Sequence, residues 1–129
     1  MEKIIKQEYL IKAPIEKVWQ ALTEPKEIDM WGGGPAKMKA EENYEFSLWD
    51  GDIHGKNIKV AKGKTLKQEW YSGKWQKPSI VTFDLSEKSG KTTVKLVHTD
   101  VPEDEKKSIS DGWKDFYMGP LKKLLEKKK

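Results

Sequence analysis

The side chains best suited to acid, base or metal chemistry are few, and they lie far apart in this chain. His54 and His98 are the two histidines, and their separation matches no metal-ligand spacing. His98 alternates with Val94 and Leu96 on one face of a predicted strand, so we expect a core or rim histidine rather than a catalytic base. His54 falls in a predicted turn. The absence of cysteine excludes disulfides and thiolate ligands for metals.

Three aspartates come nearest to forming a carboxylate set: Asp50, Asp52 and Asp84. The segment Asp50-Gly51-Asp52 is typical of a hairpin turn, in which an aspartate side chain accepts a hydrogen bond from its own backbone. It lacks the later ligands and the terminal glutamate of a calcium-binding loop. We therefore interpret these aspartates as structural and expect no metal site.

An enzyme needs a positioned nucleophile, acid or base, and the sequence offers no such cluster. It contains no nucleophile elbow, phosphate-binding loop or dinucleotide fingerprint. Gln68, His98 and Asp100 are the only strand-facing polar groups worth testing as a site. We predict no catalytic residues and no cofactor. A hydrolase or cyclase that works inside a cavity is the enzyme alternative.

Large apolar side chains are the richest feature, with six tryptophans, four tyrosines and three phenylalanines. Many recur at the spacing of strands and helices, so they either fill a core or line an apolar cavity for a hydrophobic ligand. The candidates for lining a cavity are Trp31, Met38, Phe46, Leu48, Ile58, Trp70, Phe83, Leu96, His98, Trp113, Phe116, Tyr117 and Leu121. Trp49 and Trp75 fall on less clearly buried positions and are candidates for contact with a partner.

The elements that must hold these side chains begin with a strand at residues 3–12, where apolar and charged side chains alternate. Pro14 and Pro25 each suit the first turn of a short helix, and the second helix ends near Trp31. The glycines and proline of residues 32–35 predict a bend into a second strand at 36–41.

Turn residues then recur as in a series of hairpins. They separate predicted strands at residues 44–49, 58–60, 66–72, 80–85 and 92–101. No helical segment lies between these strands, so the sheet is predicted to be antiparallel.

The last segment predicts a long amphipathic helix that begins near Pro102. Acidic residues occupy its first turn, which suits the positive end of the helix dipole. Pro120 removes one backbone hydrogen bond and disfavours a helical Gly119, so we predict a kink there. The apolar stripe of the helix contains Ile109, Trp113, Phe116, Tyr117, Leu121, Leu124 and Leu125.

Together these elements predict one α+β domain that covers residues 1–129. We expect a helix-grip arrangement, in which a curved antiparallel sheet of six to seven strands wraps a long C-terminal helix. Two short helices lie between the first and second strands. The space between the helix and the sheet is then either core or pocket.

The charge balance argues against a nucleic-acid partner. All 25 basic residues are lysines, so the guanidinium group that binds phosphate and guanine in a bidentate manner is missing, although the sequence pI is about 9.1. No apolar run approaches the ~18 residues of a membrane span, and the N-terminus leads directly into a lysine-studded strand. We therefore expect no membrane span, no signal peptide and a cytoplasmic location.

Three stretches of the sequence carry a family resemblance: residues 13–23 (APIEKVWQALT), residues 35–55 with the run YEFSLWDGDIHG, and residues 111–117 (DGWKDFY). They resemble the activator of heat-shock protein 90 ATPase, specifically its C-terminal domain and the single-domain relatives of that domain. That family lies in the START-like (SRPBCC) superfamily of helix-grip proteins. Gly119-Pro120-Leu121 departs from the smoother helical continuation of the family.

The resemblance implies a non-catalytic, co-chaperone-like binding domain whose partner is a heat-shock protein 90-type chaperone. The eukaryotic co-chaperone makes its main chaperone contact through a separate N-terminal domain, for which we expect no room here. A carrier or sensor of a small hydrophobic ligand, held between the C-terminal helix and the sheet, is the alternative. We expect a monomer in either case.

Overall fold

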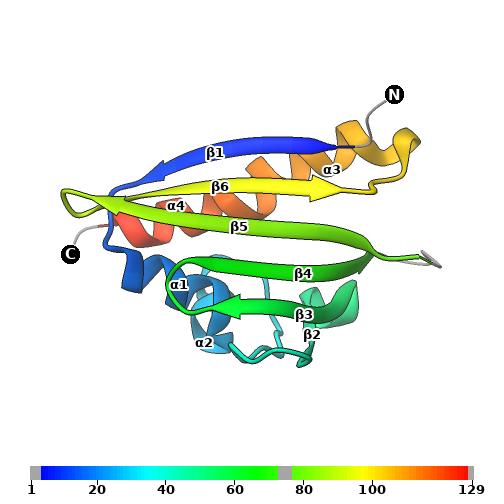
Figure 1. The fold of residues 1–129 in the computed structure, drawn as a ribbon, viewed down its shortest axis with the longest axis horizontal. Coiled ribbons are helices and arrows are strands. Elements are labelled where there is room, and N and C mark those ends of the chain that lie inside the picture. The colour runs from blue at the N-terminus through cyan, green and yellow to red at the C-terminus, as the bar shows by residue number, and fades with distance from the viewer. Residues whose placement is uncertain (1–3, 73–76, 128–129) are drawn as a thin grey trace.

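An antiparallel sheet forms the body of the domain. The computed structural model describes residues 4–72 and 77–127, and within them the sheet has six strands in the order β1-β6-β5-β4-β3-β2 (Figure 1). The strand bounds are β1 Ile5–Ile11, β2 Glu45–Leu48, β3 Ile53–Ala61, β4 Thr65–Ser72, β5 Ser79–Lys88 and β6 Lys91–Thr99. Strands β2 to β6 follow one another as hairpins, and β1 pairs with β6, so β1 and β2 are the two edges.

Two short helices connect β1 to the rest of the sheet. α1 (Ile15–Thr23) follows Pro14, which is its N-cap, and α2 begins at Pro25 and ends at Trp31. Proline suits these positions because the first amides of a helix have no partner within the helix. The indole of Trp31 donates to the carbonyl of Ala21 over 2.9 Å and ties α2 to α1.

The C-terminal helix lies against the sheet, behind β5 and β6 in the view of Figure 1. It begins with a 3-10 turn at Glu103–Glu105 and continues as α3 (Lys106–Gly112), a π turn (Trp113–Met118) and α4 (Gly119–Glu126). Gln7 in β1 donates to Ser110 at one end of this helix, and Lys122 donates to the carbonyl of Leu10 at the other. The long helix and the two short ones confirm the predicted helix-grip fold.

Pro120 explains why a π turn interrupts this helix. It has no N–H to donate, and the N–H of Gly119 bonds to the carbonyl of Lys114, five residues earlier, instead of the usual four. The wider turn lets the chain continue into α4 through the proline. The disturbance that we predict at Gly119 therefore takes the form of a change in hydrogen-bond register in the turn before Pro120.

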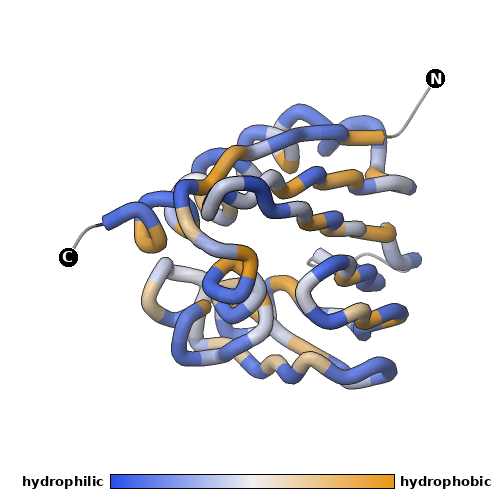
Figure 2. Tube along the Cα trace, turned by 60° about the vertical axis from the view of Figure 1, so that its left-hand side comes forward, coloured by the Kyte–Doolittle hydropathy of each residue, from blue (hydrophilic) through white to orange (hydrophobic). Residues whose placement is uncertain are grey.

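The core lies between the sheet and the helices. Inward residues alternate with outward ones along β5 and β6, and Figure 2 shows apolar and polar positions alternating along the strands. Val81, Phe83, Val94 and Leu96 are fully buried on the inward face. Leu121 closes the core from the side of the helix.

Two local predictions are wrong. Residues 36–41 do not form a strand, because the chain makes only one isolated bridge there, between Lys37 and Ser47. The side-chain amide of Asn57 donates to the carbonyls of Lys39 and Glu41, so these groups bond to a side chain instead of a neighbouring strand. His54 lies in β3 rather than in a turn.

Ile58 was predicted to line a cavity, and this is also wrong. The β3–β4 register shifts between Asn57 and Lys59, so a bulge adds a residue to β3 at this point. Asn57 and Val60 both pair with inward residues of β4, and Ile58 between them is left on the outer face, 37% exposed.

Because of the π turn, alanine substitutions at two glycines of the same helix should have opposite effects on stability. A methyl group at Gly119 would lie 2.2 Å from the carbonyl oxygen of Lys114, whereas one at Gly112 would meet nothing closer than 3.9 Å. We expect Gly119→Ala to lower the free energy of unfolding by about 1–3 kcal/mol. Gly112→Ala is the control and should raise it by about 0.5–1 kcal/mol, since alanine is the better helix former. Urea unfolding followed by circular dichroism measures both, and equal destabilisation by the two variants would contradict the assignment.

Candidate functional site

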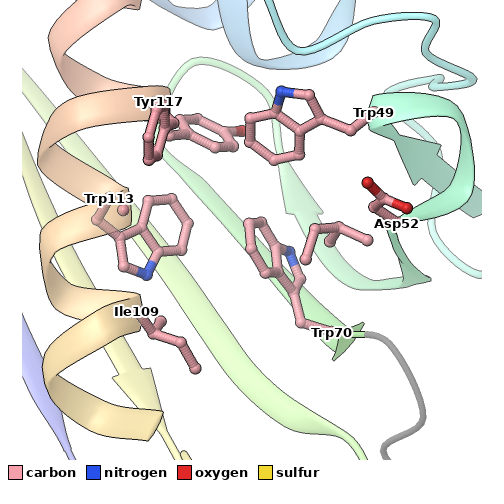
Figure 3. Close-up of a pocket in the computed structure, with 9 residues that line it drawn as sticks. Trp49, Asp52, Trp70, Ile109, Trp113 and Tyr117 are labelled. Atoms are coloured by element: carbon pink, nitrogen blue, oxygen red, sulfur yellow. The ribbon is translucent and has the colours of Figure 1, made fainter.

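An apolar groove of about 350 Å³ opens between the C-terminal helix and the corner that joins β2 to β3 (Figure 3). Its walls come from three parts of the chain that are distant in sequence. The residues that line it are Trp49, Asp52, Ile53, Trp70, Ile109, Gly112, Trp113, Phe116 and Tyr117. The volume is at the lower end of the range for small-molecule sites and is ample for one apolar side chain of a partner protein.

The helix supplies one wall because its apolar residues recur at spacings of three and four. Ile109 and Trp113 lie one turn apart, and the π turn that follows carries Phe116 and Tyr117, which also line the groove. Trp113 and Tyr117 are buried, but Phe116 is 66% exposed and lies at the mouth. Trp70 reaches the groove from the inward face of β4.

The opposite wall is a tight turn with an uncommon backbone. Trp49 and Asp50 have positive φ angles of 48° and 56°, and Gly51 follows at 98°. Positive φ is rare for a bulky residue such as tryptophan, and its cost must be offset by surrounding contacts. Trp49 bonds through its backbone N–H to the carbonyl of Gly33 over 2.7 Å. This turn directs the Trp49 ring toward Tyr117, with 6.2 Å between ring centroids.

Aromatic rings pack against one another to form the floor of the groove. Trp70 and Trp113 stack with their centroids 4.7 Å apart, and Tyr117 lies 4.7 Å from Trp113. Phe83 closes the floor from β5. Such pairs are worth about 0.5–1.5 kcal/mol each beyond the area they bury, so the floor is a rigid surface.

A hydrogen-bond network centred on His98 holds Trp113 in place. The indole Nε1–H of Trp113 donates to Nδ1 of His98 over 3.0 Å, and His98 Nε2 lies 2.7 Å from the hydroxyl of Ser79. Tryptophan can only donate here, so Nδ1 must accept and the proton of neutral His98 lies on Nε2. The Ser79 hydroxyl accepts a hydrogen bond from this N–H and donates one to the carbonyl of Trp70 over 3.2 Å. Both ring nitrogens are thus occupied.

A second network positions Trp70. Its indole donates to Oε1 of Gln68 over 2.7 Å, and Nε2 of Gln68 donates to Oδ1 of Asn57 over 2.9 Å. Gln68, Asn57 and His98 are all fully buried, but Asp100 is exposed in the connection after β6. The structure does not bring Gln68, His98 and Asp100 together as one polar site, because Gln68 and His98 each bond to a different tryptophan.

Two titratable side chains beside the groove are kept neutral by burial. Desolvation lowers the pKa of His98 to about 4, and it raises the pKa of Tyr117 far above the ordinary value. Among the buried side-chain nitrogen and oxygen atoms of the described residues, only the hydroxyl of Tyr117 has no hydrogen-bond partner. Such an unpaired group costs about 1–3 kcal/mol of stability. Neither side chain is poised to transfer a proton at neutral pH.

The predicted lining residues divide into groups. Trp70, Trp113, Phe116 and Tyr117 line the groove, together with Trp49, which we predicted as a partner contact. The others apart from Ile58 are buried in the core, where they support the floor without lining it: Trp31, Met38, Phe46, Leu48, Phe83, Leu96, His98 and Leu121. Trp75 lies outside the described residues.

Sequence reasoning missed four lining residues: Asp52, Ile53, Ile109 and Gly112. Ile109 belongs to the apolar stripe of the helix, so the signal was present for it. Asp52 and Ile53 follow the turn that the sequence predicts at Asp50-Gly51, but no sequence pattern indicates the positive φ of Trp49, where that turn begins.

The described residues contain no group of histidines, aspartates and glutamates arranged to hold a metal ion. Within the same ranges, 4–72 and 77–127, no helix is both long and apolar enough to cross a bilayer.

The His98 network predicts a loss of stability in mild acid. Because its pKa is lowered in the folded state, the unfolded chain binds the extra proton first as pH falls. The contribution of neutral His98 is complete above about pH 6.5 and is lost progressively toward pH 4, by about 3 kcal/mol in total. Urea unfolding at pH 7.0, 6.0, 5.0 and 4.5 measures this slope. His98→Asn should flatten it, and the control His54→Asn, which leaves the network intact, should keep it. An equal slope in His98→Asn and wild type would contradict the assignment.

Comparison with known proteins places these features in a family. The family model described as Activator of Hsp90 ATPase homolog 1-like protein matches residues 12–126. The activator of 90 kDa heat shock protein ATPase homolog 1 of Homo sapiens is 22% identical over 125 residues, which are 95% of this chain and 37% of the human protein. The chain thus spans little more than a third of the length of that relative.

Two solved structures share the fold over almost all of their length. An HSP90 activator from Plasmodium falciparum superposes with a TM-score of 0.86 at 22% identity, covering 95% of this chain and 96% of that one. The Aha1 dimer from Colwellia psychrerythraea gives a TM-score of 0.82 at 23% identity with the same coverage. The match of the family model to nearly the whole chain means that this protein belongs to the family of Activator of Hsp90 ATPase homolog 1-like proteins.

Proposed function

We propose that this domain is a non-catalytic binding module that docks on a heat-shock protein 90-type chaperone. Family membership over residues 12–126 is the observation that carries the proposal. The domain would influence the partner's ATPase cycle by contact alone. The neutral state of His98 and the occupation of both its ring nitrogens support a role without catalysis.

The mouth of the groove is the docking surface that we propose. Phe116 is 66% exposed there, and it adjoins Ile109 and Trp49, which are half-buried. An exposed aromatic side chain beside a desolvated apolar hollow is the usual setting of a binding hot spot. In this arrangement an apolar side chain of the chaperone enters the groove, and Phe116 covers it from the rim.

Phe116→Ser tests this surface. Removal of a hot-spot aromatic should weaken binding to the chaperone of the same organism about tenfold or more, as measured by isothermal titration calorimetry. The same variant should reduce the effect of the domain on ATP turnover. Because Phe116 is exposed, the substitution should change the free energy of unfolding by no more than about 0.5 kcal/mol.

Met30→Ser is the matched control, since Met30 is 65% exposed and does not line the groove. It should bind the chaperone as the wild type does. Equal loss of binding in both variants would place the contact elsewhere, and absence of any complex with the wild type would contradict the proposed function.

A second function is favoured by the groove itself: a carrier or sensor of a small hydrophobic ligand. All the residues that line it, apart from Asp52, are apolar, aromatic or glycine. Native mass spectrometry of protein purified without detergent should then detect a bound small molecule. Gly112→Leu should abolish the adduct, because a methyl group already fits at Gly112 and a larger side chain would extend into the groove. Gly112→Ala is the control, and an adduct that survives Gly112→Leu would contradict a ligand in this groove.

A further inference from the structure

The hydroxyl of Tyr117 is buried and has no hydrogen-bond partner among the described residues. Trp31 lies 4.5 Å from the Tyr117 ring, and Trp113 and Trp70 lie 4.7 and 6.0 Å from it, between centroids. The indole N–H groups of these three tryptophans are already bonded, to Ala21, His98 and Gln68 respectively. Tyr117 also lines the groove, so a molecule bound there is one source of a partner for this hydroxyl.

Trp49 lies across the groove from Tyr117, with 6.2 Å between ring centroids. Figure 3 shows the Tyr117 side chain directed across the groove toward the Trp49 ring. Trp49 is only half-buried, whereas Trp31, Trp70 and Trp113 are buried. It is therefore the least buried of these four tryptophans.

The backbone under Trp49 is held, so any movement must be a rotation of the side chain. The N–H groups of Trp49 and Asp50 bond to the carbonyls of Gly33 and Pro35, and Asp52 bonds back to Trp49. The positive φ angles of Trp49 and Asp50 persist because these bonds impose them. The turn thus holds the Trp49 backbone in place, and the indole projects from it at the entrance of the groove.

We propose that the groove takes a neutral, flat, apolar molecule that carries a carbonyl oxygen, and that Trp49 turns aside so that this oxygen accepts a hydrogen bond from Tyr117. This inference rests on the second proposed function, the ligand carrier, and specifies its ligand. The groove volume of about 350 Å³ limits the molecule to a few rings, and the stacked tryptophans of the floor favour a flat one. Asp52 is the only carboxylate among the described residues that line the groove, and it disfavours an anion.

A pair of probes of equal shape tests the hydrogen bond. 2-Acetylnaphthalene carries a ketone, and 2-isopropenylnaphthalene replaces the carbonyl oxygen by a CH₂ group. Equilibrium dialysis against the full chain should show that the ketone binds about fivefold tighter or more. Tyr117→Phe should remove this preference and leave the affinity for the alkene unchanged. It should fold at least as stably as the wild type, because it loses only an unpaired hydroxyl.

Tyr71→Phe is the matched control. Tyr71 lies in β4 and does not line the groove; it points to the outer face of the sheet, where it stacks on His54 with centroids 5.2 Å apart. This variant should keep the preference for the ketone. If Tyr71→Phe removes the preference as well, the hydrogen bond is not made by Tyr117.

Stopped-flow measurement of ketone binding tests the part played by Trp49. Trp49→Ala should raise the association rate several-fold, because no side chain has to turn aside, and an unchanged rate would overturn this role.

Equal binding of the two probes to the wild type would overturn the carbonyl contact but keep a ligand-binding groove. Failure of both probes to bind would overturn the inference and the carrier function together.

Discussion

The bond between the Trp113 indole and neutral His98 is the interaction on which the rest of the site depends. It joins the C-terminal helix to β6 inside the core, and through Ser79 it reaches the backbone of Trp70. The link therefore joins the two tryptophans that stack as the floor of the groove. An indole cannot accept a hydrogen bond, so protonation of His98 would set two donors against each other. The hydrogen bond that positions Trp113 therefore also requires His98 to stay neutral.

Two buried hydrogen-bond networks position the floor of the groove, one for each of its two stacked tryptophans. One runs from Trp113 through His98 to Ser79, and the other runs from Trp70 through Gln68 to Asn57. Asn57 also bonds to the irregular segment that precedes β2. The polar residues of this core therefore have structural partners, and the surface they support is apolar. The buried polar groups thus serve to position the aromatic rings of the groove.

The sequence predicted the fold well, because its local patterns agree with the final packing. Two prolines place the short helices, the alternation along β1, β5 and β6 selects their inward faces, and the spacing of Trp113, Tyr117 and Leu121 selects the buried side of the helix. Even His98 was placed on the correct face by its alternation with Leu96.

The predictions that were wrong concern features that depend on contacts between residues distant in sequence. The bulge that turns Ile58 outward and the side-chain bonds that prevent a strand at residues 36–41 both involve Asn57, which no periodic pattern distinguishes. The groove depends on the turn at Trp49, whose positive φ angles come from bonds to Gly33 and Pro35. Core and groove residues share one aromatic pattern, so only three-dimensional packing separates Phe83 from Trp113.

The π turn has a consequence for how this chain compares with others of similar fold. A turn closed by hydrogen bonds five residues apart holds one residue more than an α-helical turn, without adding length to the helix. The residues after it therefore lie on the faces that residues one position earlier would occupy in an unbroken α-helix. A relative with an unbroken α-helix here would need one residue fewer between Trp113 and Leu121 to bury the same faces. A single-residue gap at this place in an alignment would then mark a change in the shape of the groove wall, not a loss of the helix.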